Sequence, residues 1–248
     1  MAAGHLDQAD GLLQRLQEIQ DRMLEEGRLA RPRPPAPAAL YWPWLGLRYR
    51  AAATLFADAA RRAASVHETK ELDSLHREAM AWQAQGNEFG DNPALETAID
   101  RWRALLLRRP RQQVPLVWAM TQNNLGSALR ILGERESRPE LLEEAVAAYR
   151  EALQEWTRER VPLKWAATQY SLGLALLSLG EREGGPERLE EAVAAWQQAL
   201  EVFEAEGLDH YSGMDVSSLR KRIQNTRALI DQRRAAPGAG QGVSSAEG

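Results

Sequence analysis

The chain has 248 residues and a net charge of −4, so no global basic field is present to attract nucleic acid. The absence of cysteine excludes disulfides and thiolate metal sites and fits a cytoplasmic protein. Only three of the 31 basic residues are lysines, and this arginine bias is typical of GC-rich bacterial genomes.

The N-terminal residues, 1–29, are predicted to form an amphipathic helix. Its apolar stripe has the helical spacing of four, three and four residues: Leu12, Leu16, Ile19 and Met23. The segment has neither the basic start nor the sustained apolar stretch of a signal peptide, and none is predicted.

Residues 30–44 follow as a linker that is rich in proline and aromatic residues, and we expect it to be extended and stiff. Residues 45–67 return to a helical pattern and are expected to pack on the stack of repeats. Since no proline or glycine separates them from the next helical segment, whether there are one or two helices here stays open.

An internal repeat of 47 residues is the clearest feature of the chain. Residues 114–160 and 161–207 align without a gap and are identical at 28 of 47 positions. A fixed period of this length indicates a stack of helical units. We therefore assign repeats to 113–160 and 161–207, and a degenerate earlier repeat to 68–112.

Each full copy is predicted to be a helical hairpin. Helix A spans about 115–132 and 162–179, and Gly133 and Gly180 stand where a helix end favours a left-handed residue. A charged loop follows, and then Pro139 or Pro186 opens helix B, where a missing N–H is harmless.

The C-terminal region continues the period in weakened form. Residues 208–234 are predicted to form a capping helix, because Gly173 of the second copy is replaced by Arg220, which no closely packed helix would accommodate. The tail, residues 235–248, is predicted to be disordered.

Each copy carries a Leu-Gly-x-Ala-Leu phrase on helix A and an Ala-x-x-x-aromatic-x-x-Ala-Leu phrase on helix B. The first copy has Leu125, Gly126, Ala128, Leu129, Ala145, Tyr149, Ala152 and Leu153. The second has Leu172, Gly173, Ala175, Leu176, Ala192, Trp196, Ala199 and Leu200. The pattern resembles the tetratricopeptide repeat (TPR), in the long variant of bacterial arrays. The common TPR unit has about 34 residues, and the extra residues here lie in the charged loop and in longer helices.

This resemblance implies an all-α fold, an α-α superhelix of TPR-like helical hairpins with an N-terminal helical extension and a C-terminal cap helix. In the TPR family, helix A lines a concave face that commonly binds a peptide or a partner helix. The positions expected to face this groove are Asn123, Asn124, Ser127, Arg130, Tyr170, Ser171, Leu174 and Leu177. A carboxylate clamp is not predicted, because the second copy has Ala167 and Ser171 at the equivalent places.

The repeated aromatic residues are interpreted as core, since repetition follows the packing unit: Trp118, Trp165, Tyr149 and Trp196. Thr121 and Thr168, with Gln122 and Gln169, are repeated polar residues on helix A. For these we favour hydrogen bonds to a neighbouring helix or loop over contacts with a peptide backbone.

A second candidate surface combines basic and aromatic residues near the N-terminal linker. Its members are Arg31, Arg33, Tyr41, Trp42, Trp44 and Arg48. Such a segment suits docking to an anionic membrane surface or an acidic partner. We favour a structural interpretation, in which the aromatic residues cover the N-terminal end of the stack.

No catalytic or metal-binding pattern is present in the sequence. The four histidines form no HExxH motif, and neither a phosphate-binding loop nor a GxSxG motif occurs. We predict no cofactor, no metal and no enzymatic activity. The preferred function is an adaptor or scaffold that binds a protein or peptide. The alternatives are a homo-oligomeric self-assembly module, or a membrane-surface adaptor acting through residues 28–50.

Overall fold

The computed structural model describes residues 42–64, 68–211 and 214–235, with only the backbone for residues 42–48 and 214. The helix predicted over 1–29, most of the linker and nearly all of the predicted tail lie outside these residues. The chain divides into two units, residues 1–108 and 109–248, and each is described by itself.

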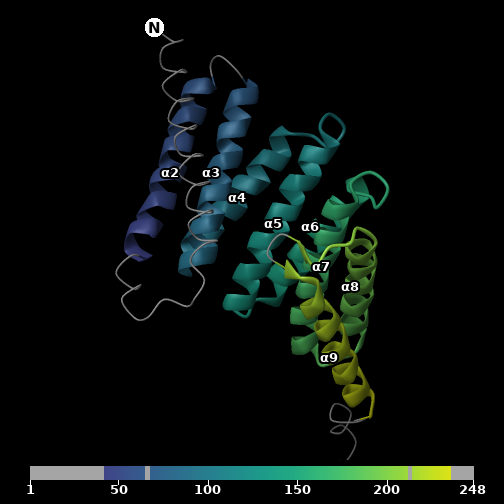
Figure 1. Ribbon diagram of the computed structural model, residues 1–248. Helices are drawn as coiled ribbons and strands as arrows, with labels where there is room; N and C mark the ends of the chain where they lie inside the picture. Colours follow the sequence, from purple (N-terminus) through teal and green to yellow (C-terminus); the bar gives the residue numbers. More distant parts are fainter. Residues whose placement is uncertain (1–41, 65–67, 212–213, 236–248) are drawn as a thin grey trace, which may run out of the picture. The chain divides into compact units, whose positions relative to one another are not determined.

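The described part of the chain is all-α, with helices packed in adjacent pairs (Figure 1). The first unit contains α2 (Trp42–Ala63), α3 (Glu68–Phe89) and α4 (Asn92–Arg108). The second contains α5 (Pro115–Arg135), α6 (Pro139–Glu155), α7 (Pro162–Glu183), α8 (Glu187–Ala205) and α9 (Val216–Ala235). A small antiparallel hairpin of β1 (His210–Tyr211) and β2 (Met214–Asp215) precedes α9. The predicted fold class, helical hairpins in sequence, is confirmed.

In the first unit, α3 packs against both α2 and α4. The sequence left open whether the region that begins at residue 45 contains one helix or two, and the structure shows two, α2 and α3. Trp102 of α4 is fully buried, and its Nε1 donates a hydrogen bond of 2.9 Å to Oε1 of Gln83. The buried carboxylate of Glu78 is paired with Arg101 at 2.7 Å, which offsets the cost of its burial.

The predicted ends of helix A are wrong. Gly133 and Gly180 are buried inside their helices, which continue to Arg135 and Glu183. A Cβ atom on Gly180 would lie 2.7 Å from Cδ2 of Leu189, so this glycine allows helix B to approach closely. The left-handed residue lies four positions later, at Gly184, whose φ is 79°.

The sequence predicted that all four repeated aromatic residues belong to the core, and the structure confirms this for two of them. Tyr149 and Trp196 are 1% and 0% exposed. Trp118 and Trp165 are instead half-buried, because each lies at the edge of its repeat. The guanidinium of Arg111 lies 5.2 Å from the ring centre of Trp118, a favourable cation–π distance.

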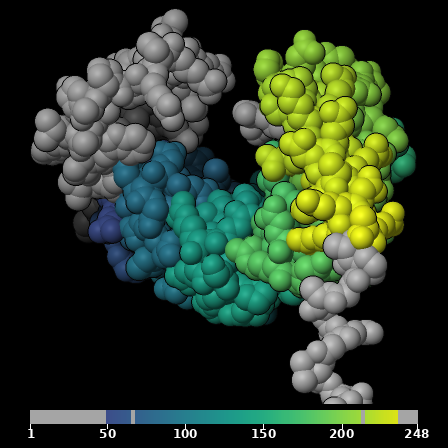
Figure 2. Space-filling view, turned by 90° about the horizontal axis from the view of Figure 1, so that it is seen from below, coloured from purple at the N-terminus to yellow at the C-terminus, as the bar shows by residue number. Residues whose placement is uncertain are grey.

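The last helix, α9, packs against α8, and Figure 2 shows its yellow atoms lying on the green surface. Its inner side chains Leu219 and Ile223 are buried, and they lie 47 residues after Leu172 and Leu176 of the second copy. Arg220 is exposed and forms an ion pair of 2.7 Å with Glu204. The residue that breaks the repeat pattern thus lies at the surface rather than between helices.

Candidate functional site

One face of α5 is only partly covered by the core, against which Met120 packs. Met120, Asn124, Ser127 and Ile131 follow a spacing of four, three and four residues, so they share this face, and all four are half-buried. Leu116, one turn earlier, is 42% exposed. The face is therefore partly apolar and partly polar, which suits contact with a polypeptide.

The adjacent helix α7 contributes a second row of half-buried side chains, which includes Tyr170, Ser171, Leu174 and Leu177. Side-chain hydrogen bonds join α7 to α5. The hydroxyl of Thr168 donates to Oδ1 of Asn123 at 3.2 Å, and the hydroxyl of Ser178 donates to Oε1 of Glu134 at 2.8 Å. We call the combined half-exposed surface of α5 and α7 the helix-A face.

The predicted groove residues all lie on α5 or α7, but they are not equally available. Asn123 already accepts the hydrogen bond from Thr168. The guanidinium of Arg130 contacts both carboxylate oxygens of Glu134 at 2.7 Å, and its side chain is only 18% exposed. Asn123 therefore joins α5 to α7, and Arg130 is engaged within α5, whereas Asn124, Ser127 and Leu174 are half-buried on the surface.

The repeated polar residues of helix A mainly serve the scaffold. Thr121 and Thr168 are buried, and each donates its hydroxyl to the carbonyl four residues earlier, at 2.9 and 2.8 Å. Gln169 donates to Oε1 of Gln198 on α8 at 2.9 Å. The bonds of Thr168 to Asn123 and of Gln169 to Gln198 agree with the predicted contacts to a neighbouring helix, whereas the Thr121 hydroxyl bonds to its own helix.

Tyr149 lies beneath the helix-A face and was predicted only as a core residue. Burial raises the pKa of its phenol, although Arg130, Ser127 and Ser171 lie beside the hydroxyl and oppose that shift. The hydroxyl is therefore neutral at physiological pH and remains a hydrogen-bond donor.

The basic and aromatic docking segment is largely outside the described residues. Arg31, Arg33 and Tyr41 are not described, and only the backbone of Trp42, Trp44 and Arg48 is given, as part of α2. The linker was predicted to continue to residue 44, but α2 begins at Trp42. Proline is tolerated in the first turn of a helix, so Pro43 does not prevent this earlier start.

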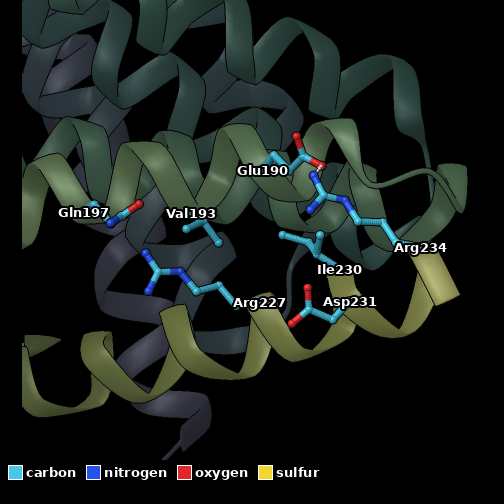
Figure 3. A pocket seen from close by; sticks show the side chains of 7 residues that line it. All are labelled: Glu190, Val193, Gln197, Arg227, Ile230, Asp231 and Arg234. Carbon is cyan, nitrogen blue, oxygen red and sulfur yellow. Dashed lines mark hydrogen bonds and ion pairs between the residues drawn. The ribbon is translucent and has the colours of Figure 1, made fainter.

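A small pocket of about 300 Å³ lies between α8 and α9 (Figure 3). Its lining residues are Glu190, Val193, Gln197, Arg227, Ile230, Asp231 and Arg234. Arg234 is engaged by Glu190 at 2.7 Å, and the two acidic and two basic residues balance in charge. The pocket therefore favours neither an anion nor a cation.

The described residues contain no cluster of His, Asp and Glu that could hold a metal ion. Nor does any helix among them combine the length and the apolar character that crossing a membrane requires.

No protein-family model and no curated protein matches this sequence. Among solved structures, the chain is similar to BtubC (BKLC) from P. vanneervenii, with 17% identity, 81% of each chain covered and a TM-score of 0.49. MamA protein aligns with 76% of this chain and 97% of its own, at 15% identity and a TM-score of 0.29. The de novo designed helical repeat protein DHR64 aligns with 95% of this chain and 100% of its own, at 15% identity and a TM-score of 0.27. Likeness at this level says nothing about activity or partners.

Sequence reasoning missed three residues that the structure brings to the helix-A face or directly beneath it. Met120 and Ile131 could have been found from the helical period, since they are spaced correctly from Asn124 and Ser127. The polar role of the Tyr149 hydroxyl had no signal in the sequence, because it depends on which groups surround the buried ring.

Proposed function

We propose that this chain is a TPR-like scaffold without catalytic activity that binds a peptide or a helical segment of a partner protein along the helix-A face. A cytoplasmic location is part of the proposal, because the chain has no cysteine. A homo-oligomeric or membrane-surface role would depend on residues 1–48, whose side chains are not described.

One observation carries this proposal. The two full copies share the buried residues of their core but differ on the helix-A face, where Asn123, Ser127 and Arg130 of the first copy correspond to Tyr170, Leu174 and Leu177 of the second. A packing surface repeats with its unit, whereas a recognition surface differs from unit to unit because the successive residues of a ligand differ. The mixture of apolar and polar groups suits a peptide.

The proposal can be tested with a displayed library of random peptides selected on the full chain. Leu116→Glu and Leu174→Glu together place two charges on the helix-A face and are expected to abolish binding of the selected peptides, because apolar contacts are lost and carboxylates are forced out of water. The matched control is Ala147→Glu with Ala194→Glu, at equivalent exposed places on α6 and α8. Equal loss in both variants, with both folded by circular dichroism, would refute the helix-A face as the site.

A further inference from the structure

The pocket between α8 and α9 has a counterpart one repeat earlier, between α6 and α7, and that counterpart is filled by a helix. There α8 packs against α7, and ion pairs join its first turns to α6. Arg188 of α8 donates to Oε1 of Glu143 at 2.6 Å, and Arg150 of α6 pairs with Glu191 of α8. Inside the stack, this groove therefore receives the start of a helix B.

The α8 side of the pocket repeats the residues of α6 that receive this helix. Glu190 and Val193 lie 47 positions after Glu143 and Val146, and Glu143 is the residue that binds Arg188. Because α9 is the last helix that the structure describes, no described helix follows it at the equivalent place. The pocket thus marks the place where a further helix B would begin.

On the α9 side, arginine stands where the inner helix has glycine. Arg220 and Arg227 lie 47 positions after Gly173 and Gly180, and these two glycines allow side chains of α8 to approach closely. A helix that lies against α9 cannot come as near as α8 comes to α7, because the arginine side chains occupy that space. Its contacts with α9 are therefore made to charged groups.

The helix α9 is strongly basic, although the chain as a whole is acidic. Its 20 residues include six basic residues and one acidic residue, a net charge of +5, whereas the chain carries −4. Part of this charge is neutralised within the second unit. Arg220 pairs with Glu204 and Arg234 pairs with Glu190, each at 2.7 Å.

The other four basic residues of α9 have no carboxylate partner in the part of the chain that the structure describes: Lys221, Arg222, Arg227 and Arg233. An indole ring engages Arg222, and backbone oxygens engage Arg233. Lys221 and Arg227 are exposed, and Figure 3 shows the Arg227 side chain extending from α9 toward α8. Asp231 is the single acidic residue of α9 and is outnumbered, so this surface attracts negative charge.

The pocket itself suits an uncharged side chain. Val193 and Ile230 form its apolar part and are 6% and 5% exposed. The aliphatic stems of Arg227 and Arg234 add apolar surface at its edge. In the counterpart inside the stack, the side chain at this place is that of Leu189, which lies against Gly180.

We propose that the pocket and the exposed basic side of α9 form a second docking surface, which binds an acidic amphipathic helix of a partner protein. An aliphatic side chain of that helix enters the pocket, and its carboxylates contact Lys221 and Arg227. The surface shares no residue with the helix-A face, so this inference goes beyond the proposed function.

Two other classes of partner fit this surface less well. The exposed apolar residues of α9 are only alanines, Ala228 and Ala235, which give little to insert among lipids. The carboxylates of Glu190 and Asp231 line the pocket and repel the phosphates of a nucleic acid.

The test uses a fluorescent peptide with the sequence of α6 (Pro139–Glu155), a helix B with five glutamates and one arginine and a net charge of −4. It is titrated into the full chain at low salt, where we expect saturable binding that weakens as salt screens the exposed charges. In NMR spectra, the amide signals of Gln197 and Arg227 should shift, whereas those of Asn124 and Ser127 on the helix-A face should not.

Charge reversal on the chain tests the basic side of the surface. Lys221→Glu with Arg227→Glu should lower the affinity for the peptide roughly tenfold or more, because two attractions become repulsions. The matched control, Arg62→Glu with Arg77→Glu, makes the same change in net charge at exposed places of the first unit and should bind as the wild type does. Circular dichroism checks that both variants fold.

Changes in the peptide test the two halves of the contact without altering the chain. Leu142→Ala in the peptide removes the side chain that corresponds to Leu189, and the affinity should fall roughly tenfold, as for partial loss of a buried leucine. Replacing the peptide's glutamates by glutamine should weaken binding and remove most of its dependence on salt.

Two results would overturn the docking surface: no saturable binding of the peptide at low salt, or equal affinity of the two double variants. Tighter binding of a single-stranded oligonucleotide than of the peptide would overturn the choice of an acidic helix. Binding that appears only after removal of residues 236–248 would assign the surface to the chain's own C-terminal segment instead of a partner. None of these results affects the test of the helix-A face, so the two proposals fail separately.

Discussion

At the scale of single residues, two mid-helix glycines show how closely helix A and helix B approach. A Cβ atom on Gly173 would overlap the indole of Trp196, and a Cβ on Gly126 would lie 3.0 Å from Cε1 of Tyr149. Glycine is unfavourable inside a helix by about 1 kcal/mol relative to alanine. Its presence at both places is explained by the aromatic ring that lies against it.

The aromatic ring leaves less space for an added Cβ atom at Gly173 than at Gly126. Gly173→Ala should destabilise the chain by roughly 1–3 kcal/mol, because the indole must move and lose its bond to the Tyr170 carbonyl. Gly126→Ala should cost clearly less, since its contact is only tight and the gain in helix propensity offsets part of it. Urea unfolding of both variants measures the difference, and equal free energies of unfolding would contradict this account.

At the scale of the elements, the two full copies end helix A with different residues at the same place. Gly184 has a φ of 79°, and Ser137, its equivalent in the first copy, has a φ of 54°. The left-handed conformation is strained for a residue with a side chain and is not strained for glycine. The first copy therefore ends α5 less favourably than the second copy ends α7.

Exchanging these two residues tests the effect in both directions. Ser137→Gly should stabilise the chain by about 0.5–1 kcal/mol, because relief of the strained φ exceeds the extra entropy of glycine in the unfolded state. Gly184→Ser should destabilise it by a similar amount, and the site has open space for the side chain. Thermal unfolding of the two variants is the measurement, and shifts of the same sign would be inconsistent with the argument.

The start of α9 is held by Asp215, which acts as its N-terminal cap. The carboxylate accepts hydrogen bonds from the hydroxyls of Ser217 and Ser218 and, at 2.9 Å, from the backbone N–H of Ser217. The Ser217 hydroxyl, then that of Ser218 and the backbone donor, lower the pKa of Asp215 to about 2.

The lowered pKa of Asp215 makes the free energy of unfolding depend on pH, and the direction of that dependence follows from the direction of the shift. A carboxyl whose pKa is lowered in the folded state stabilises the fold above its ordinary value of 3.8, and the contribution disappears as the pH falls towards 2. The protection of the Ser217 amide against hydrogen exchange, relative to its intrinsic rate, should therefore fall over this range. The control is Asp215→Asn, which keeps a capping oxygen but does not titrate. If both proteins respond to pH alike, Asp215 is not the group responsible.

At the scale of the whole molecule, the stack of the second unit ends in a helix that is suited to solvent. Inward-facing Leu219, Ile223 and Ile230 are buried, while the outer side of α9 is polar. Arg233 also donates to the carbonyl oxygens of Gly180 and Gly185, at 2.6 and 2.9 Å, so α9 satisfies backbone groups where α7 ends. The last helix thus covers apolar surface and completes hydrogen bonds.

Removal of α9 should show whether this helix protects the apolar surface of the second unit from solvent. A chain ending at Gly207 would expose the apolar side of α8, and we expect a lower melting temperature together with association that increases with concentration. Light scattering with differential scanning calorimetry makes the measurement. A chain that lacks only residues 236–248 is the matched control, and similar behaviour of both truncations would show that α9 is not a functional cap.

Much of the architecture could be predicted from the repeat, because a period marks the packing unit. The hairpins and the buried Tyr149 and Trp196 were predicted in this way. The helix ends were predicted less well. Gly133 was read as a stop signal, since a glycine that permits close packing and a glycine that ends a helix look the same in sequence. The helix-A face was predicted from the resemblance, but Met120 and Ile131, which flank Asn124 and Ser127 on α5, were overlooked.

By itself, the sequence determined the all-α class, the 47-residue unit and the order of the hairpins, because these follow from local helix propensity and from a repeated apolar pattern. Only the tertiary structure decided which groups surround the polar end of each repeated aromatic ring. Trp102 donates to Gln83 and Trp196 to the backbone oxygen of Tyr170, whereas the Tyr149 hydroxyl lies beside Arg130, Ser127 and Ser171, although all three rings occupy the same place in their repeats. The difference arises because a hydrogen bond depends on the distance and angle to groups from neighbouring helices, which are separated by tens of residues along the chain.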